Sequence, residues 1–238
     1  MVTAVLFDWG GTLTPWHTID SRELWRVVVQ ESDAASGAAE AAEQLAEALF
    51  AAEREMWVRS RDEHRSASMA DVCAAAGVAL TADLLAAHER RWEPHTYTDP
   101  EAAEVLAELR ARGLRVGLLS NTQWSREHHE RILRRDGILD LFDGAVYTSE
   151  IPWTKPHPEA FRAAMAAVGV ADPGACVYVG DRLFDDIYGA QAAGMRAVHV
   201  PHSPVPASQI GHTVGEPDAV IQTLPDLVPL IDNWRAAH

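Results

Sequence analysis

Short apolar runs alternate with amphipathic helical patterns through the second half of this chain. The apolar runs are typical of buried strands and lie at residues 114–119, 144–148, 176–180 and 196–200, with a shorter run at 219–221. Helical patterns separate or follow them at residues 125–135, 158–168, 184–193 and 224–234. Because parallel strands need crossover connections that cover both faces of a sheet, this alternation predicts a mostly parallel α/β sheet.

The first half of the chain has a different pattern. Residues 3–8 form one further predicted strand, and residues 20–93 then show helical spacing with no alternation. An economical interpretation is one α/β fold interrupted by a helical segment. The sequence therefore predicts a Rossmann-like parallel-sheet core made of residues 1–14 and 98–238, with an all-helical cap domain inserted at residues 15–97.

Composition excludes some classes of partner. The formal net charge of −15 argues against non-specific binding to nucleic acid, which needs basic surface. No apolar run reaches the roughly 18 residues of a membrane span, and residues 1–8 lack a signal-peptide pattern. Cys73 and Cys176 lie far apart in apolar sequence, which indicates two buried thiols. We expect a cytoplasmic monomer or homodimer that binds neither nucleic acid nor membrane.

A carboxylate stands at the end of the first predicted strand. Asp8 follows a buried apolar run, where a charge is costly unless a cation meets it. Gly10 and Gly11 follow at once and let backbone N–H groups and a carbonyl approach a ligand closely. Thr12 adds a hydroxyl. This turn is therefore a candidate site for an anion and a metal.

Other polar residues follow or lie between the later strands. They are Ser120, Asn121, Lys155, Asp181, Asp185 and Asp186. Taken singly, each is more often part of a turn, a helix cap or an exposed loop. Ligands of open parallel sheets, however, bind at the carboxyl ends of the strands, where these residues should meet. Lys155 is also the only lysine of the chain, so its place in this set is informative.

In this order, these residues resemble the four motifs of the haloacid dehalogenase (HAD) superfamily, in its phosphatase-like subfamily with a helical cap. The motifs are an Asp nucleophile in Asp-x-Asp-x-Thr, a Ser or Thr, a Lys, and Gly-Asp followed by a further Asp. The resemblance runs from residue 3 to about residue 200 and implies a Mg²⁺-dependent hydrolase of a small phosphorylated metabolite. It implies that the catalytic residues are Asp8, Ser120 and Lys155, with an aspartyl-phosphate on Asp8.

The resemblance also implies two sets of binding residues. Phosphate is expected to contact Gly11, Thr12, Ser120, Asn121 and Lys155. Mg²⁺ is expected to bind Asp8, the carbonyl of Gly10, Asp181 and Asp186, with Asp185 as the alternative to Asp186. The Lys155 ammonium would neutralise both the nucleophile and the phosphate, so that several acids can share one site.

One position departs from the phosphatase motif. Gly10 stands where the motif carries a second Asp, which protonates the leaving oxygen and then activates water. General acid–base catalysis of this kind is worth roughly 10²–10⁴-fold. We therefore predict a slow or specialised enzyme whose phosphate monoester has a good leaving group. The alternatives are a non-catalytic or regulatory protein that binds a phosphorylated ligand and, less favoured, a 2-haloacid dehalogenase.

Further residues are candidates for contact with the substrate. His17 lies just past the Asp8 turn and could supply a proton, although a hinge or surface role is more common. Arg182 is expected at the rim of the site. His128 and His129 follow Ser120 on a helix, where we expect surface positions. The cap residues able to contact a substrate, unless they are core aromatics or solvated charges, are Trp25, Trp57, Arg59, Arg61, His64 and Arg65.

Overall fold

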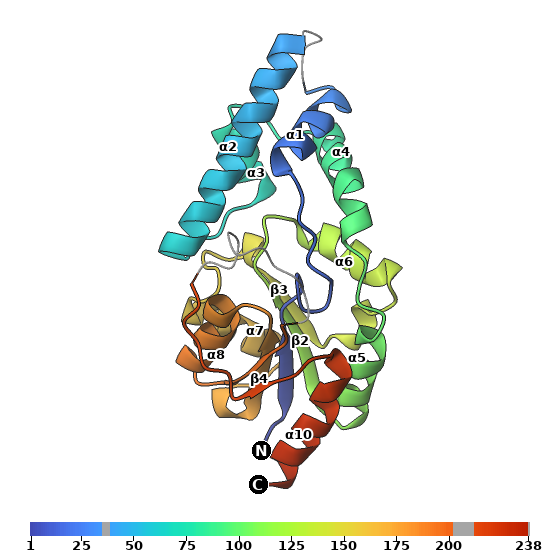
Figure 1. Cartoon of the computed structure of the whole chain (residues 1–238), viewed down its shortest axis with the longest axis vertical. Coiled ribbons are helices and arrows are strands. Elements are labelled where there is room, and N and C mark those ends of the chain that lie inside the picture. The colour runs from blue at the N-terminus through green and yellow to red at the C-terminus, as the bar shows by residue number, and fades with distance from the viewer. Residues whose placement is uncertain (35–38, 202–211, 238) are drawn as a thin grey trace.

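A six-stranded parallel sheet forms the centre of the lower half of the molecule in Figure 1. The computed structural model describes residues 1–34, 39–201 and 212–237. The strand order is β3-β2-β1-β4-β5-β6, which confirms the predicted Rossmann-like α/β architecture. The strands are β1 (Ala4–Phe7), β2 (Arg115–Ser120), β3 (Gly144–Tyr147), β4 (Cys176–Gly180), β5 (Arg196–His199) and β6 (Ala219–Val220).

Helices cover both faces of the sheet because the side chains of each strand alternate between them. In β1, Val5 and Phe7 join one apolar cluster, whereas Ala4 and Leu6 join the other. The first cluster is completed by α5 (Ala102–Ala111), α6 (Arg126–Arg135) and α10 (Leu227–Ala236), and the second by α7 (Pro158–Ala167) and α8 (Gly189–Ala192). Because β1 is buried from both faces and paired on both edges, its carboxyl end is held rigidly.

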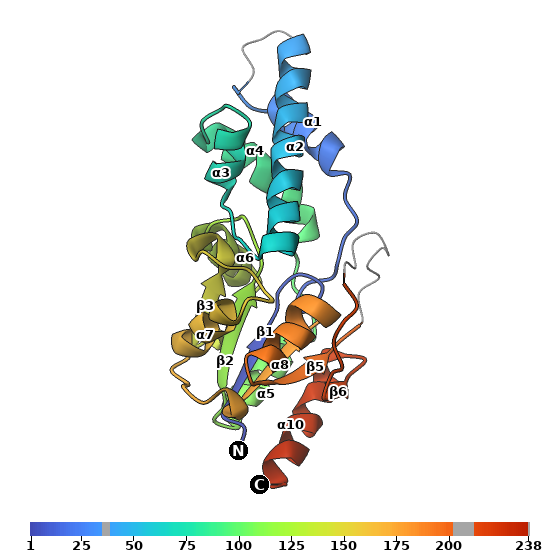
Figure 2. The ribbon, with the colours of Figure 1, turned by 90° about the vertical axis from the view of Figure 1, so that its left-hand side faces the viewer.

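Four helices lie beyond the carboxyl ends of the strands (Figures 1 and 2). They are α1 (Ser21–Gln30), α2 (Ala39–Glu63), α3 (Met69–Ala75) and α4 (Ala82–Trp92). They share an apolar cluster of their own around Trp25, Leu49 and Leu84. Asp20, Ser68 and Thr81 accept hydrogen bonds at the N-termini of α1, α3 and α4. The domain boundaries at residues 15 and 97 stay a prediction.

Backbone hydrogen bonds join the helical segment to the sheet region, and two of these connections lie near the site. Where the chain leaves and re-enters the sheet region, the Asp99 N–H donates to the carbonyl of Leu13 over 2.8 Å. At the far end of α2, backbone hydrogen bonds join residues 64–66 to residues 152–154. The second attachment lies one residue before Lys155, so the helices contact the loop that carries this lysine.

Some elements differ from the sequence-based expectation. The predicted helix at residues 184–193 is a π-helix, η5 (Leu183–Tyr188), followed by the short α8. The helix α3 lies within residues 20–93, which were predicted to be helical, although seven residues give too little periodicity to define its bounds. Most of the proline-rich stretch at residues 200–217 lies outside the described residues. Both cysteines are buried and free, as predicted, and no described helix is long and apolar enough to cross a bilayer.

Single-turn helices complete the fold. They are η1 (Glu93–His95), η2 (Leu139–Leu141), η3 (Thr148–Glu150), η4 (Pro173–Ala175) and η6 (Leu224–Asp226). Most of them end or begin the connections between strands and larger helices. The site described next depends chiefly on β1, β2, β4 and η5.

Candidate active site

Asp8 follows directly after the central strand β1 and lies in the wall of a cavity of about 560 Å³. The cavity is lined on one side by residues that follow β1, β2 and β4, and on the other by side chains of α2 and α4. Asp8 is only 6% exposed. We call Asp8, Ser120, Lys155, Asp181 and Asp186 the floor of the site, because all five lie at the carboxyl ends of the strands.

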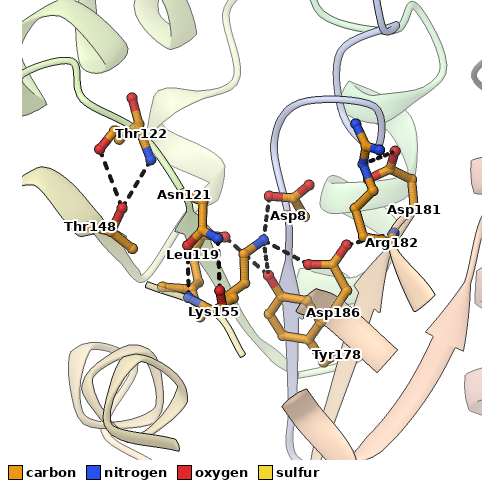
Figure 3. Close-up of polar contacts among 10 residues, drawn as sticks. All are labelled: Asp8, Leu119, Asn121, Thr122, Thr148, Lys155, Tyr178, Asp181, Arg182 and Asp186. Carbon is orange, nitrogen blue, oxygen red and sulfur yellow. Dashed lines mark hydrogen bonds and ion pairs between the residues drawn. The ribbon is translucent and has the colours of Figure 1, made fainter. Parts of the chain in front are cut away.

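The ammonium group of Lys155 joins the floor carboxylates. Its Nζ lies 2.6 Å from Asp8 Oδ1 and 2.7 Å from Asp186 Oδ1 and also donates to the Tyr178 hydroxyl at 3.0 Å (Figure 3). Burial acts to lower the pKa of Lys155, but the carboxylates of Asp186 and Asp8 raise it well above the usual value. The lysine therefore stays charged and stabilises two buried acids at once.

The loop around Lys155 is held by Asn121. Its Oδ1 accepts from the Lys155 backbone N–H at 2.8 Å, and its Nδ2 donates to the Lys155 carbonyl at 3.1 Å (Figure 3). Asn121 thus positions the lysine in addition to its predicted place at the phosphate. Tyr178, which accepts from the Lys155 ammonium, is itself held in place because its hydroxyl donates to the Leu119 carbonyl at 3.0 Å. Tyr178 is a site residue that the motifs do not indicate, because a tyrosine inside an apolar strand looks like an ordinary core residue.

Asp8, Asp181 and Asp186 form a cluster with the chemistry of a metal site. One carboxylate oxygen from each lies within 4.8 Å of the others. Asp181 is buried, yet its carboxylate accepts no hydrogen bond from any described residue, and its charged neighbour is Arg182, 3.3 Å away. Burial and the nearby carboxylates of Asp186 and Asp8 raise the pKa of Asp181 well above its usual value. An orphaned buried carboxylate beside two others fits Mg²⁺, which prefers oxygen ligands.

The nucleophile candidate is ionisable near neutral pH. Burial raises the pKa of Asp8 to about 6, Lys155 opposes this rise, and Asp186 adds to it. Lys155 thus favours the carboxylate form of Asp8 against the effect of burial. A bound divalent cation would lower the pKa further, because it stabilises the charged form.

Two glycines leave room for the carboxylates of Asp181 and Asp186. Gly11 has a φ of +88°, which L side chains rarely adopt, and a Cβ there would overlap the carboxylate of Asp181. A Cβ on Gly180 would overlap the side chain of Asp186 in the same way. Gly10 is different, because a Cβ there would meet nothing within 4 Å. The missing second Asp of the motif is therefore not explained by a lack of room.

The remaining residues of the predicted site are divided between the cavity and its surroundings. Ser120 is buried at the end of β2 and lines the cavity. Thr12 is fully buried and is not part of the cavity wall. Asp185 lines the cavity, and burial with the charge of Asp186 raises its pKa to about 6. Asp186, and not Asp185, belongs to the three-carboxylate cluster.

The π-helix η5 directs Asp186 toward Lys155. The backbone N–H groups of Asp186 and Ile187 both donate to the carbonyl of Arg182, at 3.0 and 3.1 Å. The Arg182 N–H in turn donates to Asp186 Oδ2 at 2.8 Å. The Asp186 backbone and carboxylate are thus both hydrogen-bonded to the backbone of Arg182. Sequence periodicity cannot distinguish this wider turn from an α-helix, although such turns often occur at functional sites.

Only some of the candidates outside the motifs reach the cavity. His17, Trp57, Arg61 and Arg182 line it. Trp25 is instead buried in the core of the four helices, where its indole N–H donates to Glu53 at 2.9 Å. The remaining three cap candidates, Arg59, His64 and Arg65, are not part of the cavity wall.

The surface prediction for His128 and His129 is wrong. Both are buried, and the His129 ring stacks on Tyr147 at a centroid distance of 4.6 Å. Trp124 packs against both histidines and shields them from water. Their helix is polar on average, and its periodicity cannot indicate that aromatic side chains from other elements cover this face.

Comparison with known proteins places the chain in a family. A family model described as haloacid dehalogenase-like hydrolase matches residues 2–194. The chain therefore belongs to the haloacid dehalogenase-like hydrolases, which confirms the predicted family. It is 35% identical over 123 residues to the glyceraldehyde 3-phosphate phosphatase of Pyrococcus abyssi, a match that covers 50% of this chain and 48% of that protein. The chain thus spans about half the length of the curated relatives that it matches.

Solved structures match along nearly the whole chain. A HAD phosphatase from Thermococcus onnurineus superposes with a TM-score of 0.64 and 26% identity, covering 97% of this chain and 98% of that one. The L-2-haloacid dehalogenase of Xanthobacter autotrophicus gives a TM-score of 0.65 at 21% identity, with 98% and 99% covered. At that identity, the second likeness shows the fold alone. The fold is therefore shared by enzymes with different chemistry, and the site has to distinguish them.

Proposed function

We propose that this protein hydrolyses a small phosphate monoester with the help of Mg²⁺. The observation that carries the proposal is the floor itself, where Lys155 joins Asp8 to Asp186 beside the orphaned carboxylate of Asp181. A phosphoryl group spreads negative charge over its oxygens, so catalysis is mainly positioning and charge neutralisation. A fixed ammonium and a three-carboxylate metal site supply that neutralisation.

In the proposed mechanism, Asp8 is the nucleophile. One of its carboxylate oxygens attacks phosphorus, and the bond to the leaving oxygen breaks with its electron pair. Water then attacks the aspartyl-phosphate, releasing phosphate and restoring the carboxylate. Lys155 keeps Asp8 charged and oriented and neutralises phosphate charge. Mg²⁺, held by Asp8, Asp181, Asp186 and the Gly10 carbonyl, would neutralise the remainder.

The surrounding residues complete the proposed phosphate site. Ser120 would donate to a phosphate oxygen from the end of β2. The predicted phosphate contacts of Gly11 and Thr12 are not part of the proposal, because their backbone N–H groups donate to the carbonyls of Thr14 and Trp9. We propose that the helical segment at residues 15–97 acts as a cap that excludes water and selects the substrate. The cytoplasmic location and the monomeric or dimeric state stay predictions.

Dehalogenation is the main rival chemistry, and the acid cluster opposes it. A halide leaving from carbon needs neutral or positive surroundings. Asp181 and Asp186 instead place two further carboxyl groups beside the nucleophile. The same cluster is what a metal-assisted phosphoryl transfer requires, so the floor favours a phosphatase.

A release assay tests the proposal. Wild-type and Asp8→Asn proteins would be incubated with a panel of phosphate esters and Mg²⁺, with EDTA as the metal control. We expect phosphate release by the wild type alone, and its loss in EDTA. Equal release by Asp8→Asn would overturn the role of Asp8. Halide release from a 2-haloacid in EDTA would show a dehalogenase, and Mg²⁺-dependent ester binding without turnover would show a binding protein.

A further inference from the structure

We infer that the substrate is an aryl phosphate, in which a flat aromatic ring carries the phosphoryl oxygen. This inference rests on the proposed function and names the substrate class of the same site. Two independent observations lead to it. One is the aromatic character of the cavity wall, and the other is the absence of an acidic side chain at Gly10.

Tryptophan is concentrated around the cavity. Five of the eight tryptophans of the chain line it, namely Trp9, Trp16, Trp57, Trp92 and Trp124. They come from the β1 turn and the segment after it, from α2 and α4, and from the segment after β2. Aromatic side chains from both the sheet region and the helical segment thus surround the space next to Asp8. A small sugar or amino-acid phosphate would leave the exposed indole of Trp57 uncovered.

Packing explains some of these rings but not all of them. Trp124 contacts Trp9 and Trp92 at centroid distances of 5.8 and 5.2 Å, so these three stabilise the fold. Trp57 is different. It is 41% exposed, and it makes no ring–ring or cation–π contact with any other described residue. An exposed indole on a cavity wall is available to stack on a flat ligand, a contact that aromatic pairs favour.

Phe184 places a further ring beside the floor. It lines the cavity one residue before Asp185, and it stacks on Tyr188 with ring planes 8° apart. Phe50 lines the opposite side on α2. Aromatic side chains therefore line the cavity both next to Asp185 and on α2.

The second observation concerns proton transfer. Gly10 has no side chain that could protonate the leaving oxygen, although the structure leaves room for one. An alkoxide leaving group is about as basic as hydroxide, so it departs slowly unless an acid protonates it. A phenolate is far less basic, since a phenol such as tyrosine has a pKa of about 10. An aryl ester thus relieves the need for the missing acid.

The balanced reaction needs no further reactant. The Asp8 carboxylate forms a bond to phosphorus, and the aryl oxygen leaves with the bonding pair and takes a proton from solvent. Water then cleaves the phosphorus–oxygen bond to Asp8. The first step thus runs without a proton from a protein side chain.

Three substrates separate the possible outcomes. Phenyl phosphate and cyclohexyl phosphate have similar size and differ in aromaticity and leaving group, whereas acetyl phosphate has a good leaving group and no ring. With wild-type protein and Mg²⁺, we expect kcat/KM for phenyl phosphate to exceed that for cyclohexyl phosphate by about 10²-fold or more. Trp57→Ala should raise KM for phenyl phosphate about three- to tenfold more than KM for acetyl phosphate.

A matched control removes an indole elsewhere. Trp234 lies in α10 and packs against the core, away from the cavity wall, so Trp234→Ala should leave all three kcat/KM values within about twofold. Hydrolysis of acetyl phosphate with no preference for phenyl over cyclohexyl phosphate would overturn the inference alone. An equal KM change for phenyl and acetyl phosphate in Trp57→Ala would do the same. Failure to hydrolyse any of the three would overturn the proposed function as well.

Discussion

The two sides of the cavity differ in burial and in charge. The floor is buried and charged, and Lys155 holds two of its acids within 2.7 Å. The opposite side, which we call the roof, is built from side chains of α2 and α4: Phe50, Arg54, Trp57, Arg61 and Trp92. Roof side chains are exposed or half-buried, and Arg54 makes no ion pair with any described residue. The floor thus depends on a shared buried charge, whereas exposed roof side chains such as Arg54 can be replaced with little cost to the fold.

The largest expected effect is on the floor. Lys155→Met should lower kcat/KM about 10³-fold, because a charge that stabilises the transition state is lost. It should also destabilise the fold by about 3–5 kcal/mol, since Asp8 and Asp186 lose their shared partner. Phosphate release and urea unfolding measure the two effects. A variant that is inactive but as stable as the wild type would contradict the view that this ammonium offsets buried charge.

A gain of activity is expected at Gly10. Gly10→Asp should raise kcat/KM for an alkyl phosphate such as cyclohexyl phosphate by about 10²-fold, because the new carboxyl can protonate the leaving oxygen. The gain for phenyl phosphate should be much smaller. Gly10→Ala is the matched control, since it adds a Cβ without an acid. Unchanged alkyl phosphate hydrolysis in Gly10→Asp, with Mg²⁺ binding retained, would mean that another group already acts as the acid.

Buried histidines outside the cavity wall should make the stability of the fold depend on pH. Burial lowers the pKa of His88 in α4 and of His129 in α6 to about 3. In the unfolded chain the pKa of each histidine is near 6.5. As the pH falls, these side chains therefore bind protons in the unfolded chain before they do so in the folded protein. Stability is therefore full above about pH 6.5 and is lost below it, by about 1–2 kcal/mol for each histidine at pH 5.

Urea unfolding at pH 7 and pH 5 measures this loss. His129→Asn can keep a polar partner for Thr122, whose hydroxyl lies 2.9 Å from His129 Nε2. The variant should lose less stability than the wild type over the same pH interval. An equal loss in both proteins would show that His129 does not contribute, because the titration of other groups cancels in the difference.

The smallest effect is expected on the roof. Arg54→Met removes a charge from the cavity wall but breaks no described ion pair. We expect kcat/KM for phenyl phosphate to stay within about threefold of the wild type, and stability within about 0.5 kcal/mol. Activity and urea unfolding would be measured beside Lys155→Met. A loss of kcat/KM or stability as large as that of Lys155→Met would contradict the expected difference between the floor and the roof.

The same contrast explains what the sequence could predict. All six strands and the meeting of Asp8, Lys155 and Asp186 follow from periodicity and from the geometry of parallel sheets. Those features depend on short segments with strong patterns. The boundaries of the strands were predicted to within about one residue for the same reason.

Other features depend on contacts between distant segments. Tyr178 looked like a core residue because its hydroxyl finds Lys155 only in the folded protein. The buried positions of His128 and His129 depend on Trp124, which packs against them. The π-helix at Asp186 depends on a single carbonyl that accepts two bonds. None of these leaves a periodic signal in the sequence.

The central claim is that Asp8 is a nucleophile in a site that lacks its proton-transfer group. Gly10 also leaves no side chain to activate water in the second step, so the aspartyl-phosphate should accumulate when the leaving group departs easily. The direct measurement is mass spectrometry of protein quenched in acid during turnover of phenyl phosphate with Mg²⁺. The account predicts one phosphoryl group on the peptide that contains Asp8, and none in Asp8→Asn. Turnover with a phosphoryl group on another residue, or with Asp8→Asn as active as the wild type, would contradict it.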